Sequence, residues 1–200
     1  MESWAGLAAE PSTSVMGLQK LSNADMAFTV VNFVSRDMGL PVTVADVTHG
    51  YGRFTALLYR PCFVVYSSDF RKGQHPDIVA DYVHLPYRDC CVDIILFDPP
   101  YSNNVSCGRK KSYSNWSLVH DEVATNRWSV WSGNIDGVTC REFARVLKAG
   151  GSLIFKDTRI YYYLPHFSFV NLFIQDLGCL PKIPRCVVKN YAFWSVLRKA

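Results

Sequence analysis

Four aspartates stand where predicted strands of this 200-residue chain end: Asp46, Asp69, Asp81 and Asp98. In a doubly wound sheet the carboxyl ends of the parallel strands share one edge, and ligands bind beyond that edge. One aspartate after a strand usually forms a turn or caps a helix. Four in succession instead indicate a shared site, in which the carboxylates accept hydrogen bonds from hydroxyl or amino groups.

The first of these aspartates opens a glycine turn with the sequence Asp46-Val-Thr-His-Gly-Tyr-Gly52. Gly50 and Gly52 have no Cβ, so the backbone there can approach a ligand closely. Asp69 follows Asp46 by 23 residues, a spacing at which a carboxylate binds ribose hydroxyls. Thr55 stands where a dinucleotide-binding turn has its third glycine, and this disfavours a nicotinamide or flavin cofactor.

The most specific motif is Asp98-Pro99-Pro100-Tyr101, which directly follows the apolar run 92–97. Here the sequence resembles the amino-group class of Rossmann-like S-adenosylmethionine methyltransferases, in which Asp, Asn or Ser before Pro-Pro-aromatic follows the fourth strand. It looks closest to compact phage-type or bacterial adenine N6 DNA methyltransferases, over about residues 23–198. That family usually has Pro and Phe after the first aspartate, where this chain has Val47 and Thr48.

The resemblance implies a role for each part of these motifs. The Asp98 carboxylate and the Pro99 carbonyl would each accept one N–H of an adenine amino group, so that the nitrogen lone pair faces the methyl donor. Pro100 would hold the backbone rigid, and Tyr101 would stack on a base flipped out of the helix. The implied cofactor is S-adenosylmethionine. The residues expected to bind it are Asp46, Thr48, Gly50, Gly52, Asp69 and Asp81.

The positioning elements are predicted from the spacing of apolar residues. Strands that alternate with helices are typical of a mostly parallel sheet covered on both faces. A short connection between the last two strands implies one antiparallel edge strand. The predicted fold is therefore an α/β, Rossmann-like, doubly wound sheet. Helices are expected from residue 23 to about 38 and over 54–59, 138–147 and 166–177, and strands over 42–47, 63–66, 78–80, 92–97, 152–155, 186–188 and 191–197.

The chain is predicted to be a loose arm over residues 1–20 followed by a single domain over 21–200. An insertion at about 102–134 would serve as the substrate loop, because structureless loops of this length are usually functional. It carries Arg109, Lys110 and Lys111 among several aromatic residues. These cations are expected to contact nucleic-acid phosphates, and the alternative is an ordinary loop packed on the core.

Composition limits the class of protein. The net charge of +4 is compatible with a polyanionic partner, and no apolar run reaches the roughly 18 residues of a membrane span. The N-terminus lacks the pattern of a signal peptide, so a cytoplasmic location is expected. The seven cysteines are scattered without metal-ligand spacing, so neither a metal site nor a disulfide framework is predicted.

The leading hypothesis is an enzyme that methylates adenine N6 in DNA. The alternatives are an RNA methyltransferase acting on adenine N6 or guanine N2, a cytosine N4 DNA methyltransferase, and an inactive subunit that keeps the fold to bind nucleic acid. The sequence leaves no room for a separate target-recognition domain. Either the 102–134 segment reads the substrate, or a protein partner does, or specificity is low.

Overall fold

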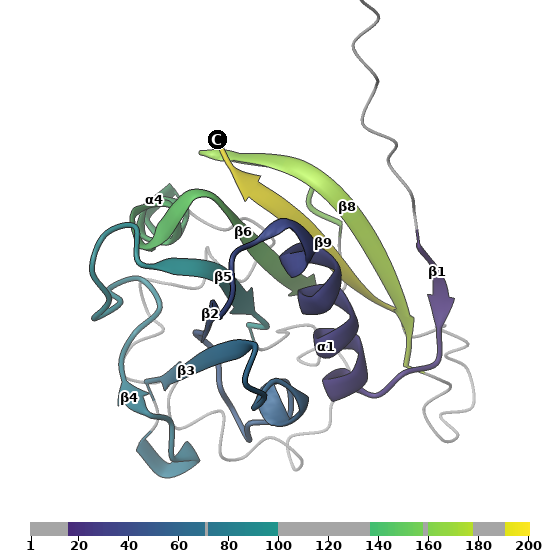
Figure 1. Cartoon of the computed structure of the whole chain (residues 1–200), viewed down its shortest axis with the longest axis horizontal. Helices are drawn as coiled ribbons and strands as arrows, with labels where there is room; N and C mark the ends of the chain where they lie inside the picture. The colour runs from purple at the N-terminus through teal and green to yellow at the C-terminus, as the bar shows by residue number, and fades with distance from the viewer. Residues whose placement is uncertain (1–15, 71, 100–136, 158–159, 178–190) are drawn as a thin grey trace, which may run out of the picture.

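The structure, a computed structural model, describes residues 16–70, 72–99, 137–157, 160–177 and 191–200. Within these ranges one nine-stranded sheet runs through the molecule, with eight strands in the order β4-β3-β2-β5-β6-β9-β8-β1 and β7 paired to β8 (Figure 1). The strands are β1 (Met16–Gln19), β2 (Val42–Asp46), β3 (Phe63–Asp69), β4 (Ile78–Val79), β5 (Val92–Phe97), β6 (Leu147–Asp157), β7 (Tyr163–Leu164), β8 (Phe167–Asp176) and β9 (Tyr191–Lys199). The helices are α1 (Asn23–Val34) and α4 (Gly137–Val146), with 3-10 turns η1 (Ser35–Asp37), η2 (Thr55–Leu57) and η3 (Lys72–Gln74).

The direction in which strands are added to the sheet reverses between β2 and β5. From β2 the chain moves outward to β3 and β4, and β5 then returns to the other side of β2. All these strands are parallel, and Asp46 at the end of β2 lies opposite Leu96 of β5. Such a reversal leaves a crevice at the carboxyl ends, where doubly wound sheets bind ligands. Asp46 and Asp98 therefore stand on the two sides of the reversal point.

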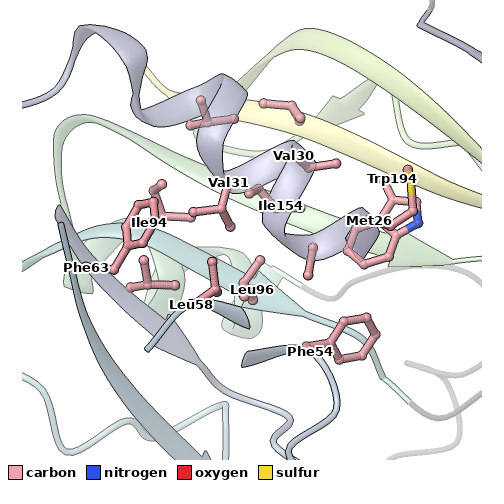
Figure 2. Packing of buried hydrophobic residues seen from close by; sticks show 14 of the residues in the cluster. Met26, Val30, Val31, Phe54, Leu58, Phe63, Ile94, Leu96, Ile154 and Trp194 are labelled. Carbon is pink, nitrogen blue, oxygen red and sulfur yellow. The ribbon is translucent and has the colours of Figure 1, made fainter. Parts of the chain in front are cut away.

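The central strands are buried on both faces of the sheet, and alternate residues of each strand point to opposite faces. On one face, Val44 of β2 and Ile94 of β5 pack in a cluster with α1 (Figure 2). On the other face, Ala45 and Ile95 pack in a second cluster with Phe143 of α4. The predicted α/β sheet covered on both faces is confirmed.

Helix α1 begins and packs as its sequence predicts. The Ser22 hydroxyl caps it by accepting a hydrogen bond from the Asp25 N–H at 3.2 Å. Ser, Asp and Asn are favoured there because their side chains satisfy N–H groups that have no partner within the helix. Met26, Val30 and Val34 then recur at helical spacing and are buried against the sheet.

The strand pairing differs from the prediction at the C-terminal side of the sheet. The single antiparallel edge strand is wrong, because β9 lies inside the sheet and runs antiparallel to both β6 and β8, and β7 is also antiparallel to β8. The helix expected over 166–177 is wrong as well, because this segment is strand β8. Strands covered on both faces read as nearly continuous apolar runs, which periodicity does not separate from a buried helix.

Two further expectations concern the ends of the chain and the segment after the glycine turn. Residues 16–19, expected within the loose arm, form strand β1 parallel to β8. The brief helix expected over 54–59 is the shorter 3-10 turn η2. The strand expected over 186–188 lies outside the described residues, and the division into an arm and a single domain stays a prediction.

Gln175 connects three parts of the core through its buried amide. Its Oε1 accepts a hydrogen bond from Trp194 Nε1 at 3.0 Å, and its Nε2 donates to the Leu21 carbonyl at 2.8 Å. Gln175→Ala leaves the buried Trp194 N–H and the part-buried Leu21 carbonyl without this partner, so we expect the free energy of unfolding to fall by about 2–4 kcal/mol. Urea unfolding measures the change. Ser168→Ala, at an exposed position of the same strand, is the control, and equal stabilities for the two variants would contradict the bridging role.

Candidate functional site

The glycine turn after β2 has the backbone geometry for which its sequence is suited. Gly50 and Gly52 have φ of +54° and +67°, values that favour glycine. The Gly52 N–H donates to the His49 carbonyl at 2.8 Å and closes the turn, while the His49 N–H donates to the Ser68 carbonyl at 3.1 Å. The turn is therefore bent back on itself and fixed to the adjacent strand β3.

A side chain at Gly52 would collide with the ring of His49. A Cβ built there would lie 2.9 Å from His49 Cε1. The sequence leaves open whether His49 faces solvent or a ligand, and the structure turns it inward, with 12% of its side chain exposed. Its Nδ1 lies 3.9 Å from Asp46 Oδ2, which is too far for a hydrogen bond.

The turn is also tied to the ends of both neighbouring strands. The Gly50 N–H donates to Asp69 Oδ2 at 2.9 Å. The Asp98 N–H donates to Thr48 Oγ1 at 2.8 Å. Thr48 stands where the family that the sequence resembles usually has Phe. Its hydroxyl joins the glycine turn directly to the start of the Asp98-Pro99 motif.

The carboxyl group of Asp46 is strongly perturbed by its surroundings. Its side chain is buried, and burial is the main cause that raises its pKa to about 7. The Thr48 N–H, which donates to Asp46 Oδ1 at 3.1 Å, opposes this rise, and the carboxylates of Asp98 and Asp69 add to it. Asp46 Oδ2 is buried and has no hydrogen-bond partner in the described part of the chain. The site therefore combines three nearby carboxyl groups with a buried, unsatisfied oxygen, which suits a ligand with a positive charge.

Asp98 is paired with a lysine that none of the predicted motifs includes. Lys156 Nζ, near the end of β6, lies 3.4 Å from Asp98 Oδ2. Only 5% of the Lys156 side chain and 20% of the Asp98 side chain are exposed. The available sequence signal is a cation directly after the apolar run Leu153 to Phe155, because a lysine in such a strand needs a partner when it is buried.

Asp81 contributes to a tight turn after β4. Its Oδ1 accepts from the Val83 N–H at 3.1 Å, and its carbonyl accepts from the His84 N–H at 2.9 Å. This is the turn-forming role that an aspartate after a strand commonly has. The part of Asp81 in cofactor binding stays a prediction.

Several predicted site residues fall beyond the described ranges. Pro99 follows Asp98 in the described chain, but Pro100 and Tyr101 lie outside the described residues. The same holds for Arg109, Lys110, Lys111 and the whole 102–134 insertion. In the ranges that are described, no group of three or more His, Cys, Asp or Glu residues could hold a metal ion, and no described helix is both long and apolar enough to cross a membrane.

Comparison with solved structures identifies the fold. The chain superposes on the Escherichia coli protein yhhF, which is named as a methyltransferase, with a TM-score of 0.52 and 9% identity over 94% of this chain and 92% of that one. A SAM-dependent methyltransferase from Methanosarcina mazei matches with a TM-score of 0.50 and 12% identity over 84% and 96%. The Burkholderia thailandensis 1,6-didemethyltoxoflavin-N1-methyltransferase, solved with S-adenosylhomocysteine, matches with a TM-score of 0.50 and 12% identity over 88% and 79%. The fold is that of the S-adenosylmethionine-dependent methyltransferases.

These similarities extend to the fold alone. No family model and no curated protein matches the chain. The chain spans about half the length of two longer solved structures that it also matches, 44% of one and 57% of the other. Within the methyltransferase fold, the glycine turn and Asp98 lie at the reversal point of the strand order, where a ligand is expected.

The raised pKa of Asp46 predicts how stability depends on pH. Between the ordinary pKa of 3.8 and the folded value of about 7, the folded protein holds a proton that the unfolded chain has lost. Stability should therefore fall as pH rises from 4 to 7 and level off above 7, by up to about 2–3 kcal/mol between pH 5 and 7. A carboxamide cannot titrate in this range, so Asp46→Asn should lack this component.

Urea unfolding of both proteins from pH 5 to 8 measures the difference between their curves. Groups that titrate in both proteins cancel in that difference. Since His49 lies 3.9 Å from Asp46, the comparison is repeated with His49→Gln in both proteins. Parallel curves for the parent and the Asp46→Asn variant would show that Asp46 ionises at its ordinary pKa.

Proposed function

We propose that this protein is an S-adenosylmethionine-dependent methyltransferase that methylates an exocyclic amino group, namely adenine N6 in DNA. The observation that carries the proposal is the hydrogen bond between the glycine turn and the Asp98-Pro99 motif. The Asp98 N–H donates to Thr48 Oγ1 at 2.8 Å, so Asp98-Pro99 begins directly beside the glycine turn. A motif that orients an amino group thus lies next to a turn that suits the methyl donor.

The residues of the glycine turn fit the proposed cofactor. S-adenosylmethionine, when bound, supplies a methyl group activated by a positively charged sulfur. Among the described residues, a Cβ built at Gly50 would meet only the Thr48 carbonyl oxygen, at 3.7 Å, and Asp46 offers a buried oxygen without a hydrogen-bond partner in the same part of the chain. We assign Asp46 to the amino group of the methionine part and Asp69 to the ribose hydroxyls. Both carboxylates would be stabilised by a cationic ligand.

Asp98 and Pro99 are proposed to prepare the substrate amino group. The lone pair of an adenine amino nitrogen is delocalised into the ring, so the nitrogen is a weak nucleophile. An Asp98 carboxylate and a Pro99 carbonyl that each accept one N–H favour a pyramidal nitrogen whose lone pair is available. Asp98 or water accepts the proton that the nitrogen loses as it gains the methyl group. The enzyme then acts mainly by alignment, with no covalent enzyme intermediate.

We further propose that DNA is the partner and that the 102–134 segment contacts it. The support is the sequence, where Arg109, Lys110 and Lys111 follow the Asp98-Pro99-Pro100-Tyr101 motif closely. Tyr101 is assigned to stacking on the flipped base. If this segment does not read the target, the alternatives are a protein partner that does so or low specificity. We also propose a cytoplasmic location, where nucleic acid and the cofactor occur together.

The test is mass analysis of nucleosides from DNA and RNA incubated with the protein and isotopically labelled cofactor. Labelled N6-methyldeoxyadenosine from DNA is the expected product. Label in RNA, as N6-methyladenosine or N2-methylguanosine, would move the substrate to RNA, and N4-methyldeoxycytidine would change the base. No label in either polymer, with the cofactor bound, would favour an inactive nucleic-acid-binding subunit.

Removal of the Asp98 carboxylate tests its assigned role. Asp98→Ala should lower the single-turnover rate of methyl transfer by about 100-fold or more, because the amino group loses one of its two acceptors. Affinity for the cofactor should stay within a few-fold, as measured by calorimetry. The matched control is Asp93→Ala, at the opposite end of β5 and paired with Lys148 at 2.8 Å. An Asp98→Ala protein as fast as this control would contradict the mechanism.

The role of the three adjacent cations is tested by salt dependence. Changing Arg109, Lys110 and Lys111 together to Ala should weaken DNA binding and flatten the plot of log affinity against log salt by up to about three units of slope. Cofactor affinity should not change, since the glycine turn and Asp69 belong to other parts of the chain. A titration series at several salt concentrations decides the matter. An unchanged slope would mean that these cations are only solvated.

A further inference from the structure

Lys156 is an unusual residue for the interior of this sheet. Only 5% of its side chain is exposed, and removing an ammonium group from water costs several kcal/mol even after relaxation of the protein. An apolar residue of similar length would avoid that cost. The ammonium group lies beside the carboxylate of Asp98, and this position accounts for a lysine here.

The surroundings of Lys156 direct its ammonium group towards the site. Nζ lies 4.8 Å from the ring centre of Phe54 and 5.5 Å from that of Trp194. These two rings meet edge to face at 5.3 Å and lie at the same end of the core cluster (Figure 2). Aromatic faces stabilise a cation but accept no ordinary hydrogen bond from it. The carboxylate of Asp98, 3.4 Å away, is a charged partner.

The carboxyl groups near Asp98 favour its protonation, which a cation beside Asp98 opposes. Asp98 and Asp69 both act electrostatically on Asp46, so three carboxyl groups share this edge of the sheet. Like charges at close range favour protonation, and a protonated carboxyl group donates a hydrogen bond where a carboxylate accepts one. A buried cation at Asp98 opposes that change.

A second lysine–aspartate pair, formed by residues of β6 and β5, serves as a structural comparison for the pair of Lys156 with Asp98. Lys148 Nζ lies 2.8 Å from Asp93 Oδ2 at the other end of β5 and β6, with 44% of the lysine side chain exposed. Asp93 Oδ2 also accepts the Thr43 N–H at 2.9 Å, so this pair joins strands at the edge away from the site. The two pairs have the same chemistry and differ in burial and in place.

We propose that Lys156 is a positioning residue, which keeps the Asp98 carboxylate ionised and oriented as the acceptor for the substrate amino group. This inference rests on the proposed function for its effect on catalysis. The effect of Lys156 on the ionisation of Asp98 is measurable without substrate.

The first experiment is carbon-13 NMR of the Asp98 carboxyl carbon from pH 4 to 9, assigned with Asp98→Ala. Lys156→Met keeps an unbranched side chain between Phe54 and Trp194 and removes the charge. We expect the midpoint of the Asp98 titration to rise by about one pH unit or more in Lys156→Met. Lys148→Met should leave it unchanged. The other ionisable groups near Asp98 are Asp46, Asp69 and His49, and observing the Asp98 carbon itself separates its response from theirs.

The second experiment is single-turnover methyl transfer under saturating cofactor. Lys156→Met should lose about 10- to 100-fold in rate with cofactor affinity within a few-fold, while Lys156→Arg and Lys148→Met keep most of the rate. In Asp98→Ala, adding Lys156→Met should cause no further loss, because the residue acts through Asp98. A purely structural lysine would instead lower stability and cofactor affinity together.

The two experiments separate the inference from the proposed function. An unchanged Asp98 titration in Lys156→Met, or rate losses that add in the double variant, would overturn the role of Lys156. A parent protein that transfers no methyl group to nucleic acid would overturn the proposed function, and the NMR titration would still decide whether Lys156 controls the ionisation of Asp98.

Discussion

Two hydrogen bonds between backbone and side chain fix the glycine turn between its neighbouring strands, and the arrangement of the site depends on them. One joins the Gly50 N–H to Asp69 on β3, and the other joins the Asp98 N–H to Thr48 Oγ1. The turn is thereby held against β3 and against the segment that follows β5. Under the proposed function, methyl donor and acceptor must meet in line within a few tenths of an ångström. The bond from the Asp98 N–H to Thr48 Oγ1 connects the two motifs directly and provides such a constraint.

The same arrangement concentrates negative charge at one edge of the sheet. Burial raises the pKa of Asp46 to about 7, so below that pH the site without a bound cation favours a neutral carboxyl group there. A positively charged ligand would reverse that preference, and binding would then be linked to loss of a proton. Lys156 offsets the charge of Asp98, the residue that we propose contacts the substrate. Among the described residues Asp46 Oδ2 has no hydrogen-bond partner, whereas Asp98 Oδ2 is paired with Lys156. These different environments suit the different tasks that we propose for the two carboxylates.

Local signals in the sequence predicted the elements that position the site. Apolar runs and the glycines at 50 and 52 depend on residues close in the chain, and the structure has strands β2, β3 and β5 and helix α1 where they were expected. Long-range pairing was not predictable in the same way. The place of β9 between β6 and β8 and the Lys156–Asp98 pair both join residues far apart in sequence. Segment 167–176 was misassigned because a strand buried on both faces lacks the alternation that identifies a strand.

The most direct test of the central claim is an amide NMR titration of the protein with S-adenosylhomocysteine, the product form of the proposed cofactor. If the turn between Asp46 and Gly52 is the cofactor site, the amide signals of Gly50 and Gly52 should shift and saturate together. Gly150 and Gly151 provide the internal control, since Gly151 lies close to the Asp93 carbonyl at the opposite end of β5, and their signals should not move. Saturable shifts confined to Gly150 and Gly151, or no shift at Gly50 and Gly52 at millimolar ligand, would contradict the account.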